Sequence, residues 1–309
     1  MAKVEVRLQP AGRAVEVAAG EGLRDALFLE GIEFPCGGEG RCRGCRVRVL
    51  SGVAPPHGDD LACFSAGEVA AGWRLACRLR AEPGLVLEVA QWEPQILSDE
   101  TSFAFVPREG SGIAVDLGTT TLVAQWVDLG TGAVLAVRTA LNAQARHGAD
   151  LMSRVEFGLR DGGLAVLRDL VREQLGGLLR ELAGEAGRAA PVREVVLVGN
   201  TVMHHLFSGL PVGTLAASPF EPADPGLQVF GPSEVGWDGV PWAEGARIAM
   251  LPCLGGFVGS DVLAGIVASG LHQAARPGVL VDLGTNGEIV VGARGRLLCA
   301  STAAGPAFE

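Results

Sequence analysis

The chain has 309 residues, of which 48% are hydrophobic and 45 are glycine. This length is about twice that of a typical domain, and the apolar content excludes a disordered protein, so we expect two or three folded units. The net charge is -10, and residues 91–309 carry 23 acidic against 14 basic side chains. That acidic excess argues against nucleic acid as the main partner, because phosphate binding needs clustered Arg and Lys.

Neither a secretory signal nor a membrane span is indicated. The first residues alternate charged and apolar side chains and lack the apolar core of a signal peptide. The most apolar stretch, 248–275, is interrupted by Pro252, several glycines and Asp261. We therefore expect a cytoplasmic protein without a membrane partner. In that compartment, the seven cysteines are better explained by metal ligation than by disulfides.

The first 90 residues are predicted to form a small α+β unit. Alternating apolar and polar residues predict a β-hairpin over 3–8 and 14–17, and apolar spacing from Leu23 to Leu29 predicts a short helix. Further strands are expected through Val47 and at 85–89. A loop rich in glycine and cysteine follows the predicted helix.

This loop carries Cys36, Cys42 and Cys45, separated by five and then two residues, and Cys77 follows after 31 more. A [2Fe–2S] cluster needs four thiolates, and the loop glycines let backbone N–H groups turn toward the sulfurs. Zinc is the alternative, but zinc sites usually use two Cys-x-x-Cys pairs and only one exists here. Cys63 competes for the fourth position; we favour Cys77 for its Arg-Leu-Ala-Cys setting. The expected metal ligands are Cys36, Cys42, Cys45 and Cys77.

Two further features of the cysteines and their surroundings need an explanation. The arginines beside the loop are Arg41, Arg43, Arg46 and Arg48. They form either an ordinary solvated surface or a basic rim for an acidic partner, and the sequence favours neither.

Cys253 and Cys299 lie among apolar residues and are expected to be buried rather than to bind metal.

The remainder of the chain alternates predicted strands and helices, which is α/β organisation. Periodicity fades between 91 and 112, which indicates a linker. The expected strands are 113–118, 122–128, 133–138, 194–198, 247–251, 279–283, 287–292 and 296–300. The expected helices are 164–182, 201–207 and 260–274, and 211–246 is expected to be irregular.

Two segments, 113–121 and 279–288, share an apolar strand that ends in Asp-Leu-Gly-Thr, and their aspartates are 166 residues apart. Two such turns facing each other across a cleft would hold phosphates through N–H and hydroxyl groups, with carboxylates positioning Mg²⁺ through water. One turn alone is weak evidence, since Asp and Gly simply make good turns. The pair favours a nucleotide site, and the P-loop sequence is absent.

These motifs carry a resemblance to known families. The paired turns resemble the acetate kinase, sugar kinase, Hsp70 and actin superfamily, and the cysteine spacing resembles the adrenodoxin and putidaredoxin branch of ferredoxins. A [2Fe–2S] domain joined through a linker to such a kinase-like fold resembles the reductive activators of corrinoid proteins. Four more segments look like that family: 142–150, 198–205, 251–257 and 305–309.

The resemblance implies a β-grasp [2Fe–2S] ferredoxin domain over 1–90 and a linker over 91–112. It further implies an actin, Hsp70 and sugar-kinase-like α/β fold, with the first lobe or middle domain at 113–246 and the start of a second lobe at 247–309. The implied phosphate residues are Asp116, Gly118, Thr119 and Thr120 in the first turn, and Asp282, Gly284, Thr285 and Asn286 in the second.

The function implied by the resemblance is iron-sulfur electron transfer coupled to ATP hydrolysis. A one-electron transfer would return an inactive Co(II) corrinoid to Co(I), with a [2Fe–2S] cluster, ATP and Mg²⁺ as cofactors. The implied partners are a corrinoid protein or corrinoid-dependent methyltransferase and an upstream electron donor. His204 and His205 are either structural or in contact with a partner.

The chain departs from that family at its end. The second predicted hairpin finishes near residue 300, so we expect Glu309 to end a fragment with an incomplete second lobe and uncovered strands at 287–300. A ferredoxin-type electron carrier with a non-catalytic docking domain is therefore the alternative function. A sugar or acyl kinase is disfavoured, because it leaves the cluster domain unexplained.

Overall fold

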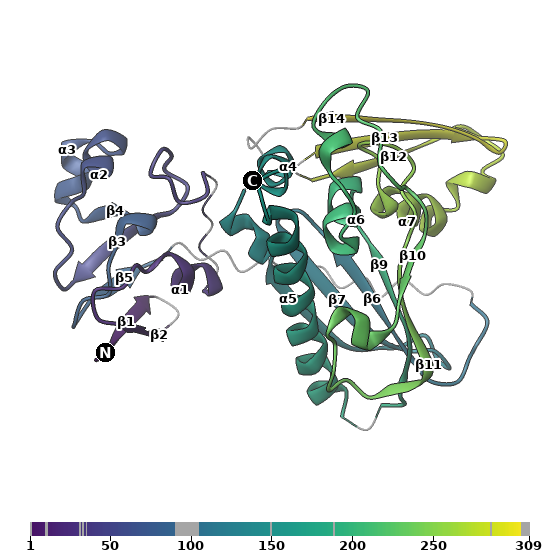
Figure 1. Cartoon of the computed structure of the whole chain (residues 1–309), viewed down its shortest axis with the longest axis horizontal. Coiled ribbons are helices and arrows are strands. Elements are labelled where there is room, and N and C mark those ends of the chain that lie inside the picture. Colours follow the sequence, from purple (N-terminus) through teal and green to yellow (C-terminus); the bar gives the residue numbers. More distant parts are fainter. Residues whose placement is uncertain are drawn as a thin grey trace. The chain divides into compact units, whose positions relative to one another are not determined.

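The computed structural model describes residues 2–9, 12–30, 32, 34, 36–89, 105–148, 150–187, 189–284 and 286–303. The chain divides into two compact units (Figure 1). The first unit comprises Met1–Ser102 and Ala145–Ala149, and the second comprises Phe103–Gln144 and Asp150–Glu309. No helix in the described part of the chain is long and apolar enough to cross a membrane.

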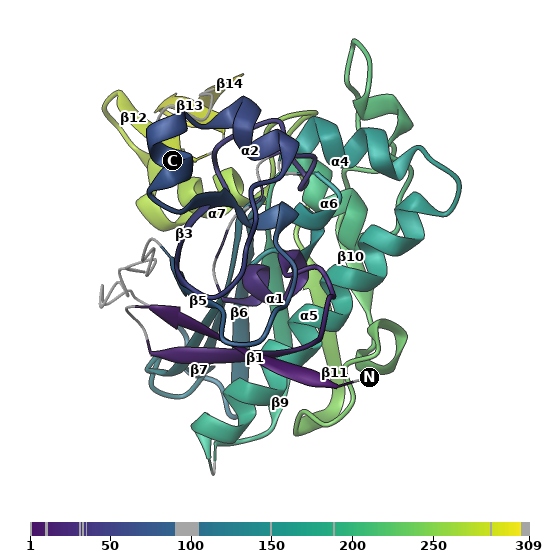
Figure 2. The same cartoon turned by 90° about the vertical axis from the view of Figure 1, so that its left-hand side faces the viewer.

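The first unit is built on a mixed five-stranded sheet of order β2-β1-β5-β3-β4. Its strands are β1 (Lys3–Gln9), β2 (Arg13–Ala18), β3 (Arg46–Ser51), β4 (Trp73–Leu75) and β5 (Val86–Glu88). Its helices are α1 (Arg24–Leu29), α2 (Gly58–Cys63), α3 (Ala66–Ala70) and the 3₁₀ turn η1 (Ala76–Arg78). Figure 2 labels α1 and α2. The hairpin β1–β2 is antiparallel, whereas β1 and β5 run parallel. This is the expected β-grasp arrangement.

The hairpin, α1, β3 and β5 confirm the elements predicted for this unit. Sequence reasoning missed α2, α3 and β4, which span only three to six residues each and show no readable periodicity. One signal was present: α3 begins with a capping box in which Ser65 and Glu68 bind each other's backbone N–H groups.

Asp60 ties α2 to the sheet. Its carboxylate is 1% exposed and accepts hydrogen bonds from the backbone N–H of His57 (2.7 Å) and of Leu75 (2.7 Å). One bond caps the helix and the other holds β4, the strand that precedes Cys77. A buried carboxylate that satisfies two backbone donors is costly to remove, because both donors are then left without a partner.

Asp60→Ala is therefore expected to destabilise the first unit by about 3 kcal/mol. The measurement is thermal loss of the visible absorbance of the cluster, with a midpoint about 10 °C or more below that of the wild type. Asp25→Ala is the control, since Asp25 forms an ion pair with Arg24 at the surface. Equal midpoints for the two variants would contradict the role given to Asp60.

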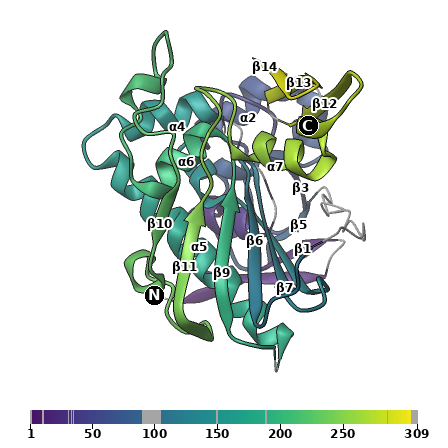
Figure 3. The same ribbon diagram turned by 90° about the vertical axis from the view of Figure 1, so that its right-hand side faces the viewer.

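The second unit contains a six-stranded sheet of order β10-β11-β9-β6-β7-β8, whose strands β11, β9, β6 and β7 lie side by side in Figure 3. The strands are β6 (Ser111–Leu117), β7 (Thr121–Asp128), β8 (Val134–Leu141), β9 (Val192–Val198), β10 (Gln228–Phe230) and β11 (Trp242–Met250). The helices are α4 (Leu151–Gly158), α5 (Gly163–Ala186) and α6 (Thr201–Ser208). The 3₁₀ turns η3 (Gly213–Leu215) and η4 (Pro232–Val235) complete this part, and η2 (Ala143–Arg146) begins in it and continues into the segment Ala145–Ala149 of the first unit.

The helix α5 confirms the amphipathic helix predicted over 164–182. Its residues Leu167, Val171 and Leu175 recur at helical spacing and are fully buried. They share one hydrophobic core with side chains of the sheet such as Leu117 and Leu197. This packing fixes the sheet whose strand ends carry the first Asp-Leu-Gly-Thr turn.

A three-stranded antiparallel sheet follows, formed by β12 (Gly278–Leu283), β13 (Asn286–Ala293) and β14 (Arg296–Ala303). Leu280 and Val290 on one face pack with α7 (Ser260–Ser269) and η5 (Leu271–Gln273). The opposite face exposes a set of apolar side chains: Val279, Val281, Leu283, Ile289, Val291 and Leu298. The strands predicted from 279 onward are confirmed.

The structure differs from the sequence interpretation at two places. Cys299 is exposed, not buried as expected, because β14 is an edge strand and the small core beneath the sheet reaches only as far as Val290. The strand expected at 247–251 begins earlier, at Trp242, and as β11 it pairs with β9 in the six-stranded sheet. Most of the predicted linker, 91–112, lies outside the described residues. The predicted domain boundaries, including the start of a second lobe at 247, stay predictions.

Candidate functional site

The cysteine loop of the first unit is shaped by the pairing of β3 with β4. Arg46 on β3 is opposite Leu75 on β4, and the N–H of Ala76 donates to the carbonyl oxygen of Cys45 (2.9 Å). This register brings the residue before β3 next to the residue after β4. The Cys45 Sγ therefore lies 3.6 Å from the Cys77 Sγ.

Cys36 and Cys42 form a second thiol pair, joined by a side-chain hydrogen bond. Burial raises the pKa of the Cys36 thiol, but the backbone N–H groups of Arg41, Glu39 and Gly40 outweigh it, so the net shift is downward. The hydrogen bond from Cys45 and the charge of Arg78 lower the pKa of Cys77 to about 7, against the opposing effect of burial. Burial and the contact with Cys36 raise the pKa of Cys42, and the contact with Cys77 together with burial raises the pKa of Cys45. One thiol of each pair is therefore favoured as the thiolate, the form that binds metal.

The loop has this shape because its glycines permit it. Gly40 has φ +75°, and a Cβ there would collide with the side chains of Asp59 and Arg78. The Arg78 guanidinium bridges Asp59 (2.5 Å) and the carbonyl oxygen of Glu39 (2.6 Å), which clamps the loop from outside.

Cys63 is placed differently from the four cysteines expected as ligands. Its thiol lies 3.5 Å from the carbonyl oxygen of Gly40, to which it donates. In the described part of the chain, no three His, Cys, Asp or Glu side chains are placed to hold one metal ion. Two separate thiol pairs suit a [2Fe–2S] cluster, in which each of two irons takes two protein ligands, better than a single zinc ion.

The arginines around this loop are largely neutralised. Arg41 pairs with Glu39, Arg43 with Glu68, and Arg48 with Glu88. Arg46 lies over the ring of Trp73, with 5.7 Å from its guanidinium carbon to the ring centre. Because three of the four charges are balanced locally, the structure favours a solvated surface over a bare basic rim.

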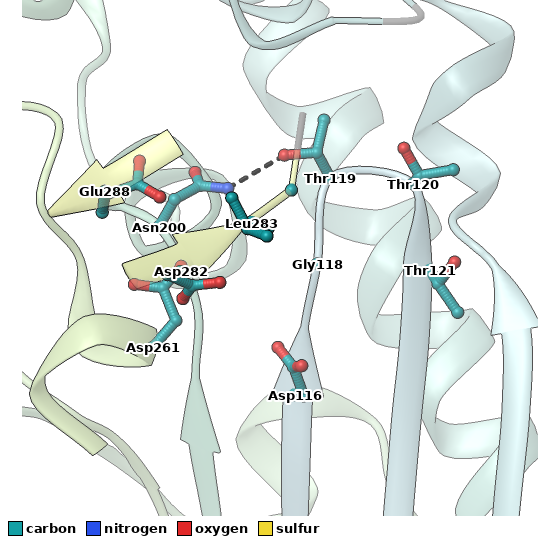
Figure 4. Close-up of a pocket in the computed structure, with 11 residues that line it drawn as sticks. Asp116, Gly118, Thr119, Thr120, Thr121, Asn200, Asp261, Asp282, Leu283 and Glu288 are labelled. Carbon is teal, nitrogen blue, oxygen red and sulfur yellow. Dashed lines mark hydrogen bonds between the residues drawn. The ribbon is translucent and has the colours of Figure 1, made fainter. Parts of the chain in front are cut away.

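The second unit holds a pocket of about 340 Å³ between its two Asp-Leu-Gly turns (Figure 4). The first turn joins β6 to β7, and the second joins β12 to β13. Eleven residues line the pocket: Asp116, Gly118, Thr119, Thr120, Thr121, Asn200, Asp261, Asp282, Leu283, Gly284 and Glu288. Asp116 and the threonines lie on one side, whereas Asp261, Asp282 and Glu288 lie on the other.

Six of the eight residues predicted to bind phosphate therefore meet in one pocket. Thr285 lies outside the described residues, as does the side chain of Asn286. Sequence reasoning missed Asn200, whose amide Nδ2 donates to the Thr119 Oγ1 (2.9 Å), and also Asp261 and Glu288. Asn200 carried a usable signal, because it lies two residues after the end of the apolar strand β9, and Asp116 lies near the end of the apolar strand β6.

The pocket concentrates carboxylates. Burial raises the pKa of Asp116 to about 6, with Asp261 and Asp282 adding repulsion. Burial, together with Asp261 and Asp282, raises the pKa of Glu288 to about 7, although Ser301 donates a hydrogen bond to it (3.0 Å). Burial also raises the pKa of Asp261. Oxygen ligands of this kind suit Mg²⁺, which keeps most of its waters and meets few carboxylates directly.

His204 and His205 are structural in this fold. Both are fully buried on α6. The His204 Nε2 lies 3.0 Å from the carbonyl oxygen of Gly226, and the His205 Nε2 accepts from the N–H of Ala223 (3.1 Å). The two rings thus hold the irregular segment that follows α6, and neither lines the pocket.

The raised pKa of Glu288 makes stability depend on pH. Between the ordinary value of 4.5 and about 7, the folded state keeps a proton that the unfolded state has lost, so stability falls as the pH rises through this window. In buffer without divalent cations, Glu288→Gln is expected to be more stable than the wild type by up to about 3 kcal/mol at pH 8, but by under about 1 kcal/mol at pH 5.

Urea unfolding at both pH values measures this difference. Glu173→Gln is the control, because Glu173 is exposed on α5 and away from the pocket. A Glu288→Gln variant with the same stability difference from wild type at pH 5 and pH 8 would contradict the burial of a proton at this side chain.

Comparison with known proteins identifies all three parts of the chain. The 2Fe-2S iron-sulfur cluster binding domain matches residues 6–82. The RACo middle region matches residues 111–274, and the C-terminal domain of RACo, the ASKHA domain, matches residues 277–309. The chain therefore has a [2Fe–2S] ferredoxin domain followed by a fold of the actin and sugar-kinase type.

Individual relatives agree with these matches. The corrinoid activation enzyme RamQ of Eubacterium limosum is 34% identical over 222 residues, which cover 69% of this chain and 36% of that protein. A component of the Na(+)-translocating NADH-quinone reductase of Chlamydia felis (strain Fe/C-56) is 30% identical over 99 residues, covering 29% of this chain and 23% of that protein. The second match is to a much smaller part of the chain.

A solved structure described as a reductive activator for corrinoid, iron-sulfur protein shares the fold. It superposes with a TM-score of 0.60 at 24% identity, over 99% of this chain and 64% of that one. This chain thus spans about a third of the Eubacterium relative and under two thirds of the solved one. Since the RACo middle region alone matches more than half of its residues, the chain belongs to the RACo family.

Proposed function

We propose that this protein is an ATP-dependent reductive activator that delivers one electron to the Co(II) centre of a corrinoid protein. The observation that carries the proposal is the presence, in one chain, of a cluster-type cysteine loop and a carboxylate-lined pocket between two Asp-Leu-Gly turns. The names of the Eubacterium relative and of the solved structure support it. A corrinoid protein, or a methyltransferase that depends on one, is then the acceptor.

We assign Cys36, Cys42, Cys45 and Cys77 as the ligands of the [2Fe–2S] cluster. The two thiol pairs and the depressed pKa values of Cys36 and Cys77 support this choice. When bound, the cluster supplies a one-electron carrier. The surrounding chain stabilises the thiolates through backbone N–H groups and the Arg78 charge.

We assign the phosphates of ATP to the two turns. Gly118, Thr119 and Thr120 line the pocket on the first turn, and Gly284 lines it on the second. We assign Thr285 and Asn286 to the phosphates from their place in the second Asp-Leu-Gly-Thr motif alone. The carboxylates of Asp116 and Asp282 line the same pocket, which supports their assignment to a hydrated Mg²⁺. Backbone N–H groups in such turns bind anions well.

The proposed reaction needs an electron and a source of free energy. One electron passes from the reduced chain to Co(II), giving Co(I), and an upstream donor then restores the electron. Hydrolysis of ATP to ADP and phosphate supplies the free energy that this unfavourable transfer lacks. We place the reaction in the cytoplasm, where free thiols such as these seven persist.

The ligand assignment predicts opposite outcomes for two cysteine variants. Cys77→Ser is expected to lose the cluster or to change its visible and electron paramagnetic resonance spectra, because a thiolate ligand is removed. Cys63→Ser is expected to keep the iron content and both spectra of the wild type. Loss of iron in Cys63→Ser with retention in Cys77→Ser would reverse the assignment.

The nucleotide assignment predicts a dependence on ATP. The reduced protein, with ATP and Mg²⁺, is expected to convert a partner corrinoid protein to Co(I), followed by its absorbance. Omitting ATP, or replacing Asp282 by Asn, is expected to reduce the yield about tenfold or more. Asp161→Asn is the control, because Asp161 is exposed on the turn before α5. Equal Co(I) formation without ATP would favour a plain ferredoxin-type carrier.

A further inference from the structure

Three polar side chains lie buried behind the first turn of the pocket. Asn142, Gln144 and Arg154 are each 0% exposed, and none of them lines the pocket. Asn142 directly follows β8, Gln144 lies in η2, and Arg154 lies on α4. Nothing in the proposed function uses these three residues.

Asn142 and Arg154 hold three consecutive carbonyl groups of the turn, two through their side chains and one through the backbone of Asn142. The Asn142 Nδ2 donates to the carbonyl oxygen of Gly118 (2.9 Å), and the Arg154 Nη2 donates to that of Thr119 (2.5 Å). The backbone N–H of Asn142 donates to the carbonyl oxygen of Thr120 (2.7 Å). The turn is therefore fixed from its buried side.

Fixing a carbonyl also fixes the N–H of the same peptide unit. In a trans peptide the C=O and N–H bonds point in opposite directions across the plane. Asn142 and Arg154, called the anchors below, hold the oxygens of Gly118 and Thr119. The N–H groups of Thr119 and Thr120 therefore point away from the anchors. That direction leads to the pocket, which both threonines line.

Gln144 connects the two anchors to each other. The Gln144 Oε1 accepts from the Arg154 Nη1 (3.3 Å), and the backbone N–H of Gln144 donates to the Asn142 Oδ1 (3.0 Å). The Gln144 Nε2 in turn donates to the carbonyl oxygen of Leu167 on α5 (2.9 Å). The turn is thus connected to the main helix of the unit through a chain of hydrogen bonds.

Burying a guanidinium is expensive, and an apolar side chain of the same volume would fill this space at lower cost. Burial lowers the pKa of Arg154 only to about 9, so the group keeps its charge at neutral pH. A positive charge directly behind the turn favours an anion in front of it. Core filling alone therefore does not explain this residue.

We propose that Arg154 and Asn142 are positioning residues that hold the 118–120 turn in its phosphate-binding shape, with the Thr119 and Thr120 N–H groups directed at the anion. This proposal rests on the proposed function in one respect, namely that the anion is the polyphosphate of ATP. The positioning itself is a property of the chain without nucleotide.

The test uses the full chain and variants at the two anchors. Arg154→Met removes the charge and the hydrogen bond to the carbonyl oxygen of Thr119. Arg154→Lys keeps the charge and a group that can donate one hydrogen bond to that oxygen. Asn142→Ala removes the side-chain hydrogen bond to the carbonyl oxygen of Gly118. Arg172→Met is the matched control. Arg172 is half-buried in this unit, donates to the carbonyl oxygen of Phe207 (2.9 Å) and contacts two phenylalanine rings, but does not line the pocket.

The first readout is amide hydrogen exchange without nucleotide. The amides of Gly118 and residue 142 donate to the carbonyl oxygens of Thr121 and Thr120, so they report on the turn. Arg154→Met and Asn142→Ala are expected to speed exchange at these amides about tenfold or more relative to amides in the middle of β7. Arg172→Met is expected to leave that ratio unchanged.

The second readout is the affinity for Mg²⁺-ATP and for pyrophosphate. Arg154→Met is expected to weaken both by about tenfold or more, with partial recovery in Arg154→Lys. Asn142→Ala gives the same test if Arg154→Met does not fold.

The outcomes separate the two proposals. If amide exchange in the turn is unaltered in Arg154→Met and Asn142→Ala, or if these variants keep the wild-type affinity, the positioning proposal is overturned. If the wild type binds neither Mg²⁺-ATP nor pyrophosphate, but amide exchange in the turn rises only in these two variants, the positioning role stands and the proposed use of ATP fails.

Discussion

The parallel pairing of β6 with β9 is the constraint on which the pocket depends. Asp116 is opposite Val198 in this pairing, so the carboxyl ends of the two strands meet at one sheet edge. Asp116 and Asn200 leave the sheet together there, although 84 positions separate them in the sequence. Ligands of open α/β sheets bind at such edges, because strand ends and the following turns deliver polar groups to one place. Packing of α5 on the sheet makes this register the stable one.

The first unit follows the same logic with a different pairing. The thiols of Cys45 and Cys77 meet because β3 and β4 are in register, and β4 is held by the buried carboxylate of Asp60. A residue with no role in metal chemistry therefore sets the distance between two cysteines. In both units, a few buried polar contacts convert strand pairing into the geometry of a site.

Much of the fold could be predicted from the sequence, because the patterns that indicate it are local. The β1–β2 hairpin, α5 and the two Asp-Leu-Gly turns each show their pattern within a short window, and each was found. Asp261 and Glu288 were not recognised as pocket residues, because their neighbours come from α7, β12 and β14 and no local pattern links them. The mistake at Cys299 has the same origin: Cys299 pairs with the buried Val290, but apolar neighbours in sequence do not reveal that the core stops short of the edge strand. Short elements such as α2 are fixed by side-chain caps, which are weaker signals than periodicity.

The exposed apolar face of the β12–β14 sheet has a thermodynamic consequence for the pocket. Asp282 and Glu288 point to one side of this sheet, while Val281 and Ile289, next to them in sequence or pairing, are exposed on the other. The strands that carry these carboxylates into the pocket therefore also carry the apolar face. A cover that bound this face and favoured this arrangement of the strands would, by linkage, raise the affinity of the pocket, and a ligand in the pocket would raise the affinity of that cover by the same factor.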